Sequence, residues 1–328
     1  MNQQVKSISL SGEIPPEAFN TRLDQCIAQL FPEYSRSKLK EWILANCVSV
    51  DGEVVNTPRL KMKGLEQISI SADLETQVED MAEQIDLDVV FEDNDILVIN
   101  KPAGLVVHPG AGNQSGTLLN ALLAHVPDIE HIPRAGIVHR LDKETTGLMV
   151  VAKTLAAQTH LVEQLQSRTM GREYEAVVMG NLIAGGSIDE NIGRHTTKRT
   201  LMAVKHSGKP AVTHYRVKKK YRAHTYLRMK LETGRTHQIR VHMAHIKHPL
   251  VGDIQYGGRA RLPKHASENF IAVLREFKRQ ALHAIQLTLT HPISGETMTW
   301  QAPLPEDFKQ LLAALDNDAQ ANGLSESM

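Results

Sequence analysis

The sequence is poor in cysteine, with only Cys26 and Cys47 in 328 residues. Two thiols are too few for a disulfide framework and are typical of a protein in the reducing cytoplasm. No apolar run approaches the roughly 18 residues that a membrane-spanning helix needs. The N-terminal segment MNQQVKSISLSGEIPPEAFN also lacks the apolar centre of a secretory signal. We therefore expect a cytoplasmic protein that makes no use of a membrane.

Nucleotide-binding and metal-binding motifs are missing as well. The loop with Gly104, Gly110 and Gly112 contains neither GxxxxGK[ST] nor a GxGxxG that opens a helix, so no nucleotide cofactor is expected. Four histidines lie close together in the sequence: His237, His242, His245 and His248. They lack the fixed helical pair and the supporting carboxylate or cysteine of a catalytic zinc site. A metal-dependent RNA hydrolase stays open as an alternative, but we expect no metal and no other cofactor.

An excess of either charge is absent overall, because 37 basic and 37 acidic residues cancel. The charges are nevertheless segregated along the chain. Residues 64–95 contain eleven acidic side chains and no Lys or Arg, whereas residues 96–304 contain 28 basic and 14 acidic side chains, an excess of 14 positive charges. A basic body of this size is typical of a protein that binds a polyanion. An uneven scatter of solvated surface charge is the alternative.

Residues 18–72 form a predicted small module. Apolar residues between Leu23 and Phe31 follow the spacing of one helix face, and Ser35 can cap a second helix. Strand-like runs flank the turn Asp51–Gly52. The pattern resembles the S4 RNA-binding domain, which implies that the basic face of the second helix lies against RNA phosphates. That face consists of Arg36, Lys38 and Lys40. For these three residues alone, an ordinary solvated helix face is the alternative.

The acidic stretch 73–88 has little periodicity and is predicted to be a linker that repels RNA and keeps two domains apart. Residues 89–328 are predicted to be the main domain with a C-terminal tail. Strands are expected at 88–101 (a hairpin), 147–154, 174–180, 211–217, 226–233 and 281–290, and helices at 118–126, 155–168, 236–246, 267–279 and 307–317. Because the strands do not alternate regularly with helices, the expected fold class is α+β with a mixed, mostly antiparallel central sheet beside a small S4-like α/β domain.

The run HRLDKETTG at residues 139–147 carries the chemistry-bearing candidate Asp142. Its neighbours His139, Arg140 and Lys143 surround the carboxylate with positive charge, which favours the ionised form. A reactive carboxylate in a cationic groove suits chemistry on an anionic polymer. From the residues alone, a structural salt bridge is an equally good interpretation.

The segments VINKPAGLVVHPG, HRLDKETTGLMVVAKT, REYEAVVMG and GRTHQIRVHMAHIKHPLVGD resemble the RluA-type pseudouridine synthases, and the resemblance covers residues 87–303. It implies a pseudouridine synthase fold for the main domain and isomerisation of uridine in RNA without a cofactor. Asp142 matches the family's catalytic aspartate, which either attacks the ribosyl unit or removes a sugar proton. Tyr174 matches the active-site tyrosine, whose ring can stack on uracil and whose hydroxyl can accept the C5 proton. Its alternative is a tyrosine packed in a strand.

The resemblance further implies that Arg240 pairs with Asp142, on a helix that Thr236 can cap. Arg235 is the less favoured partner, and the alternative for both arginines is a phosphate contact. Arg140 is expected to hold a flipped nucleotide or fill its place, whereas His139 either touches RNA or packs the loop. The implied partner is a stem-loop of 23S ribosomal RNA in the large subunit or its precursor, bound by a monomer. A non-catalytic RNA-binding or assembly factor is the remaining alternative.

Overall fold

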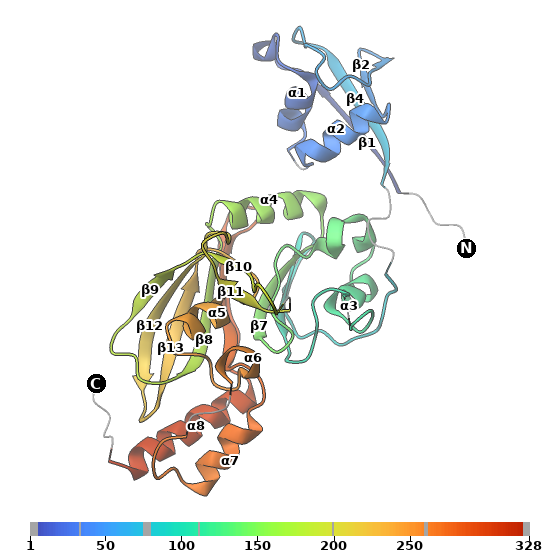
Figure 1. The fold of residues 1–328 in the computed structure, drawn as a ribbon. Coiled ribbons are helices and arrows are strands. Elements are labelled where there is room, and N and C mark those ends of the chain that lie inside the picture. Colours follow the sequence, from blue (N-terminus) through green and yellow to red (C-terminus); the bar gives the residue numbers. More distant parts are fainter. Residues whose placement is uncertain are drawn as a thin grey trace.

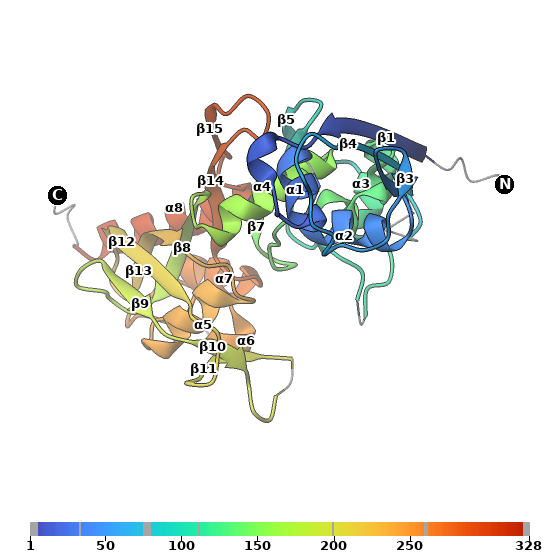
Figure 2. The ribbon, with the colours of Figure 1, turned by 90° about the horizontal axis from the view of Figure 1, so that it is seen from above.

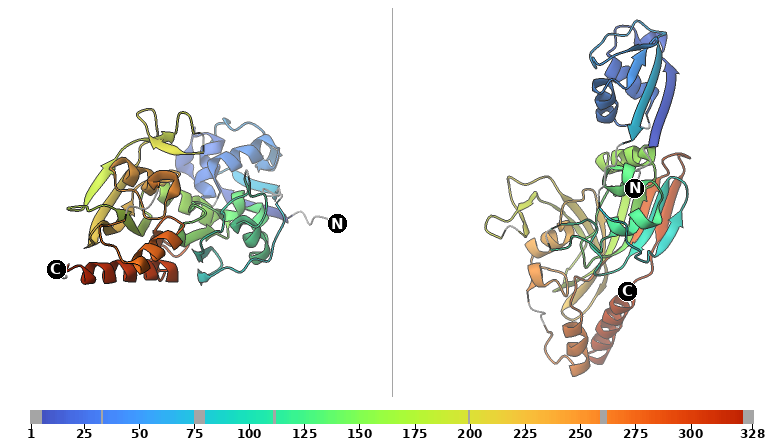
Figure 3. Two further views of the ribbon diagram at one scale, coloured as in Figure 1. Left: turned by 60° about the horizontal axis from the view of Figure 1, so that its bottom comes forward. Right: turned by 90° about the vertical axis from the view of Figure 1, so that its right-hand side faces the viewer.

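The computed structural model describes residues 6–32, 34–74, 80–110, 112–198, 200–258 and 262–323. Figure 1 shows a small N-terminal module and a larger body built on one long twisted sheet. Figure 1 and the right-hand view of Figure 3 both place the module beyond the end of the body at which helix α4 (Leu155–Gln166) lies. Within the described part of the chain, no helix is both long and apolar enough to cross a membrane.

The N-terminal module packs two helices on a four-stranded antiparallel sheet of order β1-β4-β2-β3. Its elements are β1 (Lys6–Glu13), the 3-10 helix η1 (Pro16–Ala18), α1 (Leu23–Leu30), α2 (Arg36–Leu44), β2 (Val48–Val50), β3 (Glu53–Val54) and β4 (Gln67–Leu74). The Ser35 hydroxyl accepts a hydrogen bond from the backbone N–H of Lys38, so the predicted N-cap is confirmed. The apolar helix faces meet the sheet in a buried core that includes Leu23, Ile27, Leu39, Ile43 and Ile70.

The edge strand β1 is not among the elements expected from the sequence, which begin at residue 18. It pairs along its whole length with β4, Ile8 opposite Ala72 and Leu10 opposite Ile70. Ile8 and Leu10 alternate with serines, and the partner strand lies far along the chain. This alternation is a local signal for a strand, but it is short and does not reveal the partner.

The acidic segment 73–88 contacts the main domain where it is described; residues 75–79 lie outside the described part. The side-chain amide of Asn120 donates to the carbonyl of Met81 at 2.8 Å. The Glu83 carboxylate accepts a hydrogen bond from the backbone N–H of Gly116 at 3.0 Å. This half of the predicted linker is thus fastened to the start of helix α3 (Leu118–His125).

The large sheet has the strand order β5-β6-β7-β14-β8-β13-β12-β9, and β15 pairs with β14. Its strands are β5 (Val89–Glu92), β6 (Ile96–Lys101), β7 (Thr146–Ala152), β8 (Gly171–Met179), β9 (Gly186–Asp189), β12 (Val212–Lys220), β13 (His224–Leu231), β14 (Leu282–Thr290) and β15 (Thr297–Gln301). Only β7 and β14 pair in parallel, whereas the other strand pairs of this sheet are antiparallel. The expected mixed, mostly antiparallel sheet is confirmed. A separate hairpin joins β10 (Ile192–Arg194) to β11 (Met202–Val204).

Helices cover both faces of the sheet, as the view from above shows (Figure 2). Besides α3 and α4, the body contains the 3-10 helices η2 (Ile129–His131) and η3 (Pro133–Gly136), and the helices α5 (Gln238–His245), α6 (Ile254–Gly257), α7 (Glu268–Glu276) and α8 (Glu306–Ala321). Strand β8 shows how the faces divide, because alternate side chains of a strand point to opposite sides. Tyr174 and Val178 pack in the core that includes α3 and α5, whereas Val177 and Met179 pack in the core that includes α7 and α8.

The start of α5 differs from the expectation. Thr236 does not cap this helix. His237 occupies the N-cap position in a left-handed conformation, with φ of 55°, and its side chain makes no capping hydrogen bond. Nδ1 of His237 instead lies 2.7 Å from the hydroxyl of Tyr256, a partner that the local sequence does not reveal.

The parallel contact between β7 and β14 positions the loop with Asp142, because β7 begins four residues after it. Gly147 lies opposite Ala284 in this contact. It has φ of +111°, and a Cβ atom there would lie 2.3 Å from the carbonyl oxygen of Ala284. Only glycine fits, because any side chain would push the two strands apart.

Gly147→Ala is expected to lower the free energy of unfolding by about 3 kcal/mol or more, since backbone strain and overpacking add. Gly104→Ala is the matched control, because Gly104 also has positive φ (+84°) but nothing within 4 Å of its added Cβ. Its cost should be about 1–2 kcal/mol, from the left-handed conformation alone. Urea unfolding of both variants measures the difference, and equal losses would contradict the close approach.

Candidate active site

A pocket of about 590 Å³ opens on the face of the sheet that carries Tyr174. Its wall combines the loop before β7, the start of β8, the end of α4 and the segment from Leu231 to Arg240. Asp142, Tyr174 and Arg240 all line this pocket although they come from three separate segments. The structure therefore brings together the three residues that the sequence analysis proposed as catalytic.

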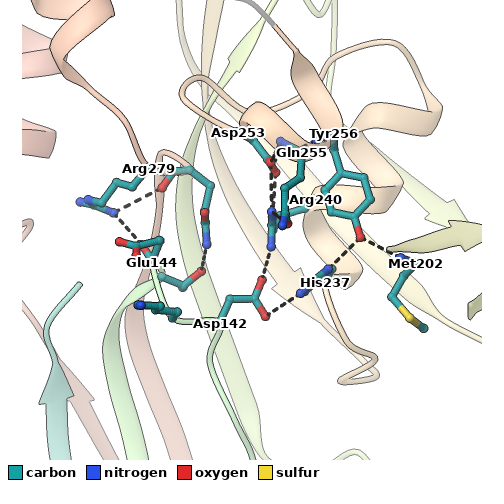
Figure 4. A network of polar contacts seen from close by, with 12 residues as sticks. Asp142, Glu144, Met202, His237, Arg240, Asp253, Gln255, Tyr256 and Arg279 are labelled. Carbon is teal, nitrogen blue, oxygen red and sulfur yellow. Dashed lines mark hydrogen bonds and ion pairs between the residues drawn. The ribbon is translucent and has the colours of Figure 1, made fainter. Parts of the chain in front are cut away.

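The Asp142 carboxylate is held by Arg240 (Figure 4). Nη1 of Arg240 donates to Oδ2 of Asp142 at 2.9 Å. The same guanidinium forms a two-pronged contact with Asp253, through Nε at 2.7 Å and Nη2 at 3.0 Å, and Nη2 also donates to Gln255. Asp253 thus fixes the arginine, and the arginine presents one nitrogen to Asp142. The Asp142 side chain keeps 16% of its surface exposed, so it can reach a ligand in the pocket.

Arg240 is 5% exposed and carries its charge securely. Burial opposes the charged form, but the hydrogen bonds and negative charges of Asp253 and Asp142 outweigh it, and the pKa of Arg240 is raised above its ordinary value. The guanidinium carbon also lies 4.9 Å from the ring centre of Tyr256. Two carboxylates therefore share one permanent cation at the edge of the pocket.

His237 approaches Asp142 from the other side, with Nε2 at 3.7 Å from Oδ1. Burial is the largest influence on this imidazole, and the pKa of His237 is lowered despite the nearby Asp142 charge. The Tyr256 hydroxyl accepts a hydrogen bond from the backbone N–H of Met202 at 2.9 Å and lies 2.7 Å from Nδ1 of His237. When that hydroxyl donates to Nδ1, the proton of the neutral ring is on Nε2, which faces Asp142. Figure 4 shows this chain of contacts from Met202 to Asp142.

The loop after Asp142 is fixed by three side chains from distant segments. Nζ of Lys101, which is fully buried, donates to the carbonyl of Lys143 at 2.9 Å and to the carbonyls of Pro102 and Leu105. Arg279 donates to the carbonyl of Glu144 at 3.3 Å, and Gln280 donates to the hydroxyl of Thr145 at 3.0 Å. Three consecutive residues of the loop are therefore each bound by a different partner.

Tyr174 is buried with its side chain at the pocket wall. Burial raises the pKa of its hydroxyl, Arg172 lowers it by a smaller amount, and the Asp142 charge adds to the increase. The phenol is therefore protonated at neutral pH and can donate a hydrogen bond. It can accept a proton from substrate only if its own proton moves on. No hydrogen bond of this hydroxyl to another described residue is present in the structure.

The three residues expected to contact RNA near Asp142 occupy different environments. Arg140 is exposed at the pocket. His139 accepts a hydrogen bond from the backbone N–H of Val150 at 3.1 Å, and burial together with the Arg172 charge lowers its pKa to about 3. This neutral ring packs the loop. Arg235 lines the pocket but donates through Nε to the carbonyl of Pro210 at 3.0 Å, and it does not contact Asp142.

The basic face of α2 is partly occupied by contacts within the module. Arg36 donates to the buried Asp24 at 2.9 Å, and Lys38 lies 3.3 Å from Glu41. Lys40 is exposed. Arg36 is also more than half exposed at its side chain, so the face stays accessible to a phosphate.

The clustered histidines of the α5 region make separate contacts. His242 bonds to Thr213 and to the Glu190 carbonyl, whereas His248 bonds to the Met179 carbonyl. Among the described residues, the groups close enough to share a metal ion lie elsewhere: Asp93, Asp95 and His291, and Asp128, Glu130 and His131. The histidines of α5 are therefore not arranged as a common ligand set.

Three pocket-side residues escaped the sequence analysis: Lys101, Arg172 and Asp253. Lys101 and Asp253 lie inside the motif segments VINKPAG and HPLVGD, so their position in the motifs was available as a signal. Nothing local indicated that Asp253 would meet the same arginine as Asp142. Arg172 is the first residue of the motif segment REYEAVVMG, but nothing local indicates that it lines the same pocket as Asp142.

Comparison with known proteins identifies the family. A family model described as RNA pseudouridylate synthase matches residues 95–245, and an S4 domain matches residues 21–66. A Haemophilus influenzae protein named ribosomal large subunit pseudouridine synthase D is 62% identical over 95% of this chain and 96% of its own length. The chain belongs to the pseudouridine synthase family. A Yersinia pestis synthase of the same name is 61% identical over 98% of both chains.

Solved pseudouridine synthase structures share the fold. The human RNA pseudouridylate synthase domain containing 4 superposes with a TM-score of 0.55 at 25% identity, over 70% of this chain and 92% of its own. Human RNA pseudouridylate synthase domain containing 1 gives a TM-score of 0.52 at 25% identity, over 76% and 99%. Together with the sequence relatives, they confirm the expected fold and family.

Asp253→Asn is expected to lower kcat about tenfold to a hundredfold, because a loosened Arg240 misplaces Asp142. The asparagine keeps the shape and the caps that Asp253 provides to Gln255 and Tyr256. Asp318→Asn is the matched control, since Asp318 is another buried carboxylate paired with an arginine, Arg222, away from the pocket. Steady-state kinetics with RNA would contradict the positioning role if both variants kept wild-type kcat.

Lys101 predicts a pH dependence of stability. Burial lowers the pKa of this lysine in the folded protein to about 7, while the unfolded lysine titrates near its ordinary value of 10.5. The unfolded chain therefore holds the proton over this interval, and the contribution of Lys101 to the free energy of unfolding rises with pH between these values. Urea unfolding at about pH 7 and about pH 9 should show a smaller rise in Lys101→Met than in wild type or in the exposed-site control Lys40→Met. Identical slopes would contradict the shifted pKa.

Proposed function

We propose that this pseudouridine synthase isomerises uridines in the RNA of the large ribosomal subunit, with Asp142 as the catalytic carboxylate. The observation that carries the proposal is the Asp142 carboxylate held by Arg240 at a pocket that also contains Tyr174. The substrate class follows from relatives about 60% identical that are named for the large ribosomal subunit. A stem-loop of 23S ribosomal RNA, in the subunit or its precursor, is the proposed target.

The reaction breaks the bond between C1′ of the ribose and N1 of uracil and forms a bond between C1′ and C5. The C5 proton leaves and N1 takes up a proton, so that the atoms balance. Asp142 begins the reaction by attack on the ribosyl unit or by removal of a sugar proton, and both routes need the ionised carboxylate that Arg240 favours. Tyr174 stacks against the uracil, and Arg240 orients Asp142. The isomerisation is redox-neutral and adds no group, so no cofactor is required.

The proposed RNA interface extends from the pocket to the N-terminal module. The target uridine must leave its stack, at a cost of a few kcal/mol, before it can reach Asp142. Arg140 is exposed at the pocket and suits a contact to the flipped nucleotide or its phosphates, and Arg235 lies further along the same wall. The basic face of α2, with Arg36, Lys38 and Lys40, would hold a more distant part of the RNA. His139 serves the loop rather than the RNA in this proposal.

The proposed organisation is an S4-like RNA-binding domain at 18–72, an acidic linker at 73–88 and a catalytic domain at 89–328. The acidic linker would keep RNA phosphates away from the junction and direct them to the basic surfaces. The enzyme would act as a monomer in the cytoplasm, where ribosomal RNA is its substrate.

Release of tritium from RNA labelled at C5 of uridine tests the function. The wild-type enzyme should release tritium from large-subunit RNA, whereas Asp142→Asn should lose at least about a thousandfold in rate, as expected for a residue that forms or breaks bonds. RNA affinity measured by filter binding should change little in this variant and is the control for correct folding.

Three outcomes would contradict the proposal. Failure of the wild-type enzyme to release tritium would favour a non-catalytic RNA-binding or assembly factor. Equal release by Asp142→Asn would remove the assigned role of Asp142. Cleavage of the RNA chain by the wild-type enzyme, abolished by EDTA, would indicate a metal-dependent hydrolase.

A further inference from the structure

Arg172 is a buried cation that the proposed chemistry does not use. It lies on β8 two residues before Tyr174, so both side chains point to the same face of the strand, and both line the pocket. Arg172 is 7% exposed. Its Nε is buried without a hydrogen-bond partner, and the guanidinium forms no hydrogen bond or ion pair with any described residue. Arg172 is one of the residues that line the pocket.

Other buried arginines of the body are paired. Arg240 binds Asp142 and Asp253, and Arg279 binds Asp307 through two nitrogens. A buried guanidinium normally needs such partners, because removal from water costs free energy that only an opposite charge or hydrogen-bond acceptors restore. Arg172 lacks them within the described part of the chain. A hydrogen-bond acceptor on a ligand in the pocket would supply the partner that the Arg172 guanidinium lacks.

Each carboxylate that lines the pocket is already paired with a residue other than Arg172. Six arginines and two carboxylates line it: Arg134, Arg140, Arg168, Arg172, Arg235 and Arg240 against Asp142 and Glu232. Asp142 is bound to Arg240 at 2.9 Å. Glu232 is bound to Arg168 at 3.0 Å and lies 2.7 Å from His214. The pocket wall therefore carries more positive than negative charge, and both of its carboxylates already have other partners.

The backbone beside Arg172 leaves room for its guanidinium. A Cβ atom at Gly234 would lie 2.7 Å from Nη1 of Arg172, so any side chain there would displace the group. Gly234 also lines the pocket. The glycine thus permits the cation to stay at the wall, where a ligand can approach both the backbone and the guanidinium.

We propose that Arg172 is the receptor for one of the two backbone phosphates that flank the target uridine. The inference rests on the proposed function, because it takes RNA as the ligand. A phosphate offers several oxygen acceptors to the fork of guanidinium nitrogens and brings the negative charge that the pocket lacks. Arg172 then acts as a binding and positioning residue, which holds the flipped nucleotide while its base lies on Tyr174 and its sugar faces Asp142.

Neutral linkages in the RNA test the contact. A synthetic stem-loop substrate would carry a single methylphosphonate at each position around the target uridine in turn. With wild-type enzyme, one flanking methylphosphonate should weaken binding about tenfold to a hundredfold, as expected when a charged hydrogen bond is lost. Arg172→Met should show the same loss with unmodified RNA and no further loss with that methylphosphonate. The matched control Arg168→Met removes a pocket arginine that is already paired with Glu232. Binding of RNA by this variant should still weaken when that methylphosphonate is introduced.

Two further variants separate a phosphate contact from a structural role. Gly234→Ala keeps the charge but displaces the guanidinium, and it should weaken binding of unmodified RNA while becoming insensitive to the same methylphosphonate. Arg172→Met should leave the melting temperature of the free protein unchanged or higher, because it removes an unpaired buried charge. The proposal would be overturned if Arg172→Met lowered the melting temperature and if its loss of RNA affinity added to the loss caused by each methylphosphonate. Arg172 would then be a structural residue.

The wild-type reaction separates this inference from the function on which it rests. If wild-type enzyme forms pseudouridine in the unmodified stem-loop but every flanking methylphosphonate weakens wild type and Arg172→Met equally, the phosphate site is wrong and the function stands. If wild-type enzyme forms no pseudouridine, the proposed function itself fails.

Discussion

The shared contact of Arg240 with Asp142 and Asp253 is the interaction on which the arrangement of the main domain depends. One carboxylate precedes β7 and the other follows α5, so the sheet must bring segments about a hundred residues apart to one point. The sheet order β7-β14-β8-β13 achieves this, because it places the start of β7 near the strand that leads into α5. Gly147 allows the backbones of β7 and β14 to meet. Because Asp253 engages two nitrogens of the arginine, the third nitrogen is left in a fixed direction for Asp142.

The elements of the fold with strong local signals could be predicted from the sequence. The helix that Ser35 caps, the hairpin before Lys101 and the apolar strand β7 each carry their pattern within a dozen residues. Asp142, Tyr174 and Arg240 were selected by resemblance, residue by residue, and the fold places all three at one pocket. Composition and periodicity alone would not have distinguished Asp142 from a salt-bridged surface carboxylate.

The features that the sequence did not reveal depend on distant partners. The strand β1 is defined by β4, and the unusual start of α5 is accompanied by the contact between His237 and Tyr256 rather than by Thr236. The role of Asp253 becomes visible only when the fold brings it to Arg240. Arg172 differs, because it stands out by having no partner among the described residues. A sequence pattern does not show that a buried side chain lacks a partner.

Lys101 fixes the loop that follows Asp142 in an unusual way. Its ammonium group binds three carbonyl oxygens, of Pro102, Leu105 and Lys143, in the manner in which many proteins gather carbonyls around a bound metal ion. Here the binding group is the chain's own amino group, which is protonated below its pKa of about 7. It cannot be diluted away, removed by a chelator or replaced by a competing ion. The shape of the loop that follows Asp142 is consequently insensitive to the ionic composition of the solution, which is useful beside an RNA whose own counterions exchange continually.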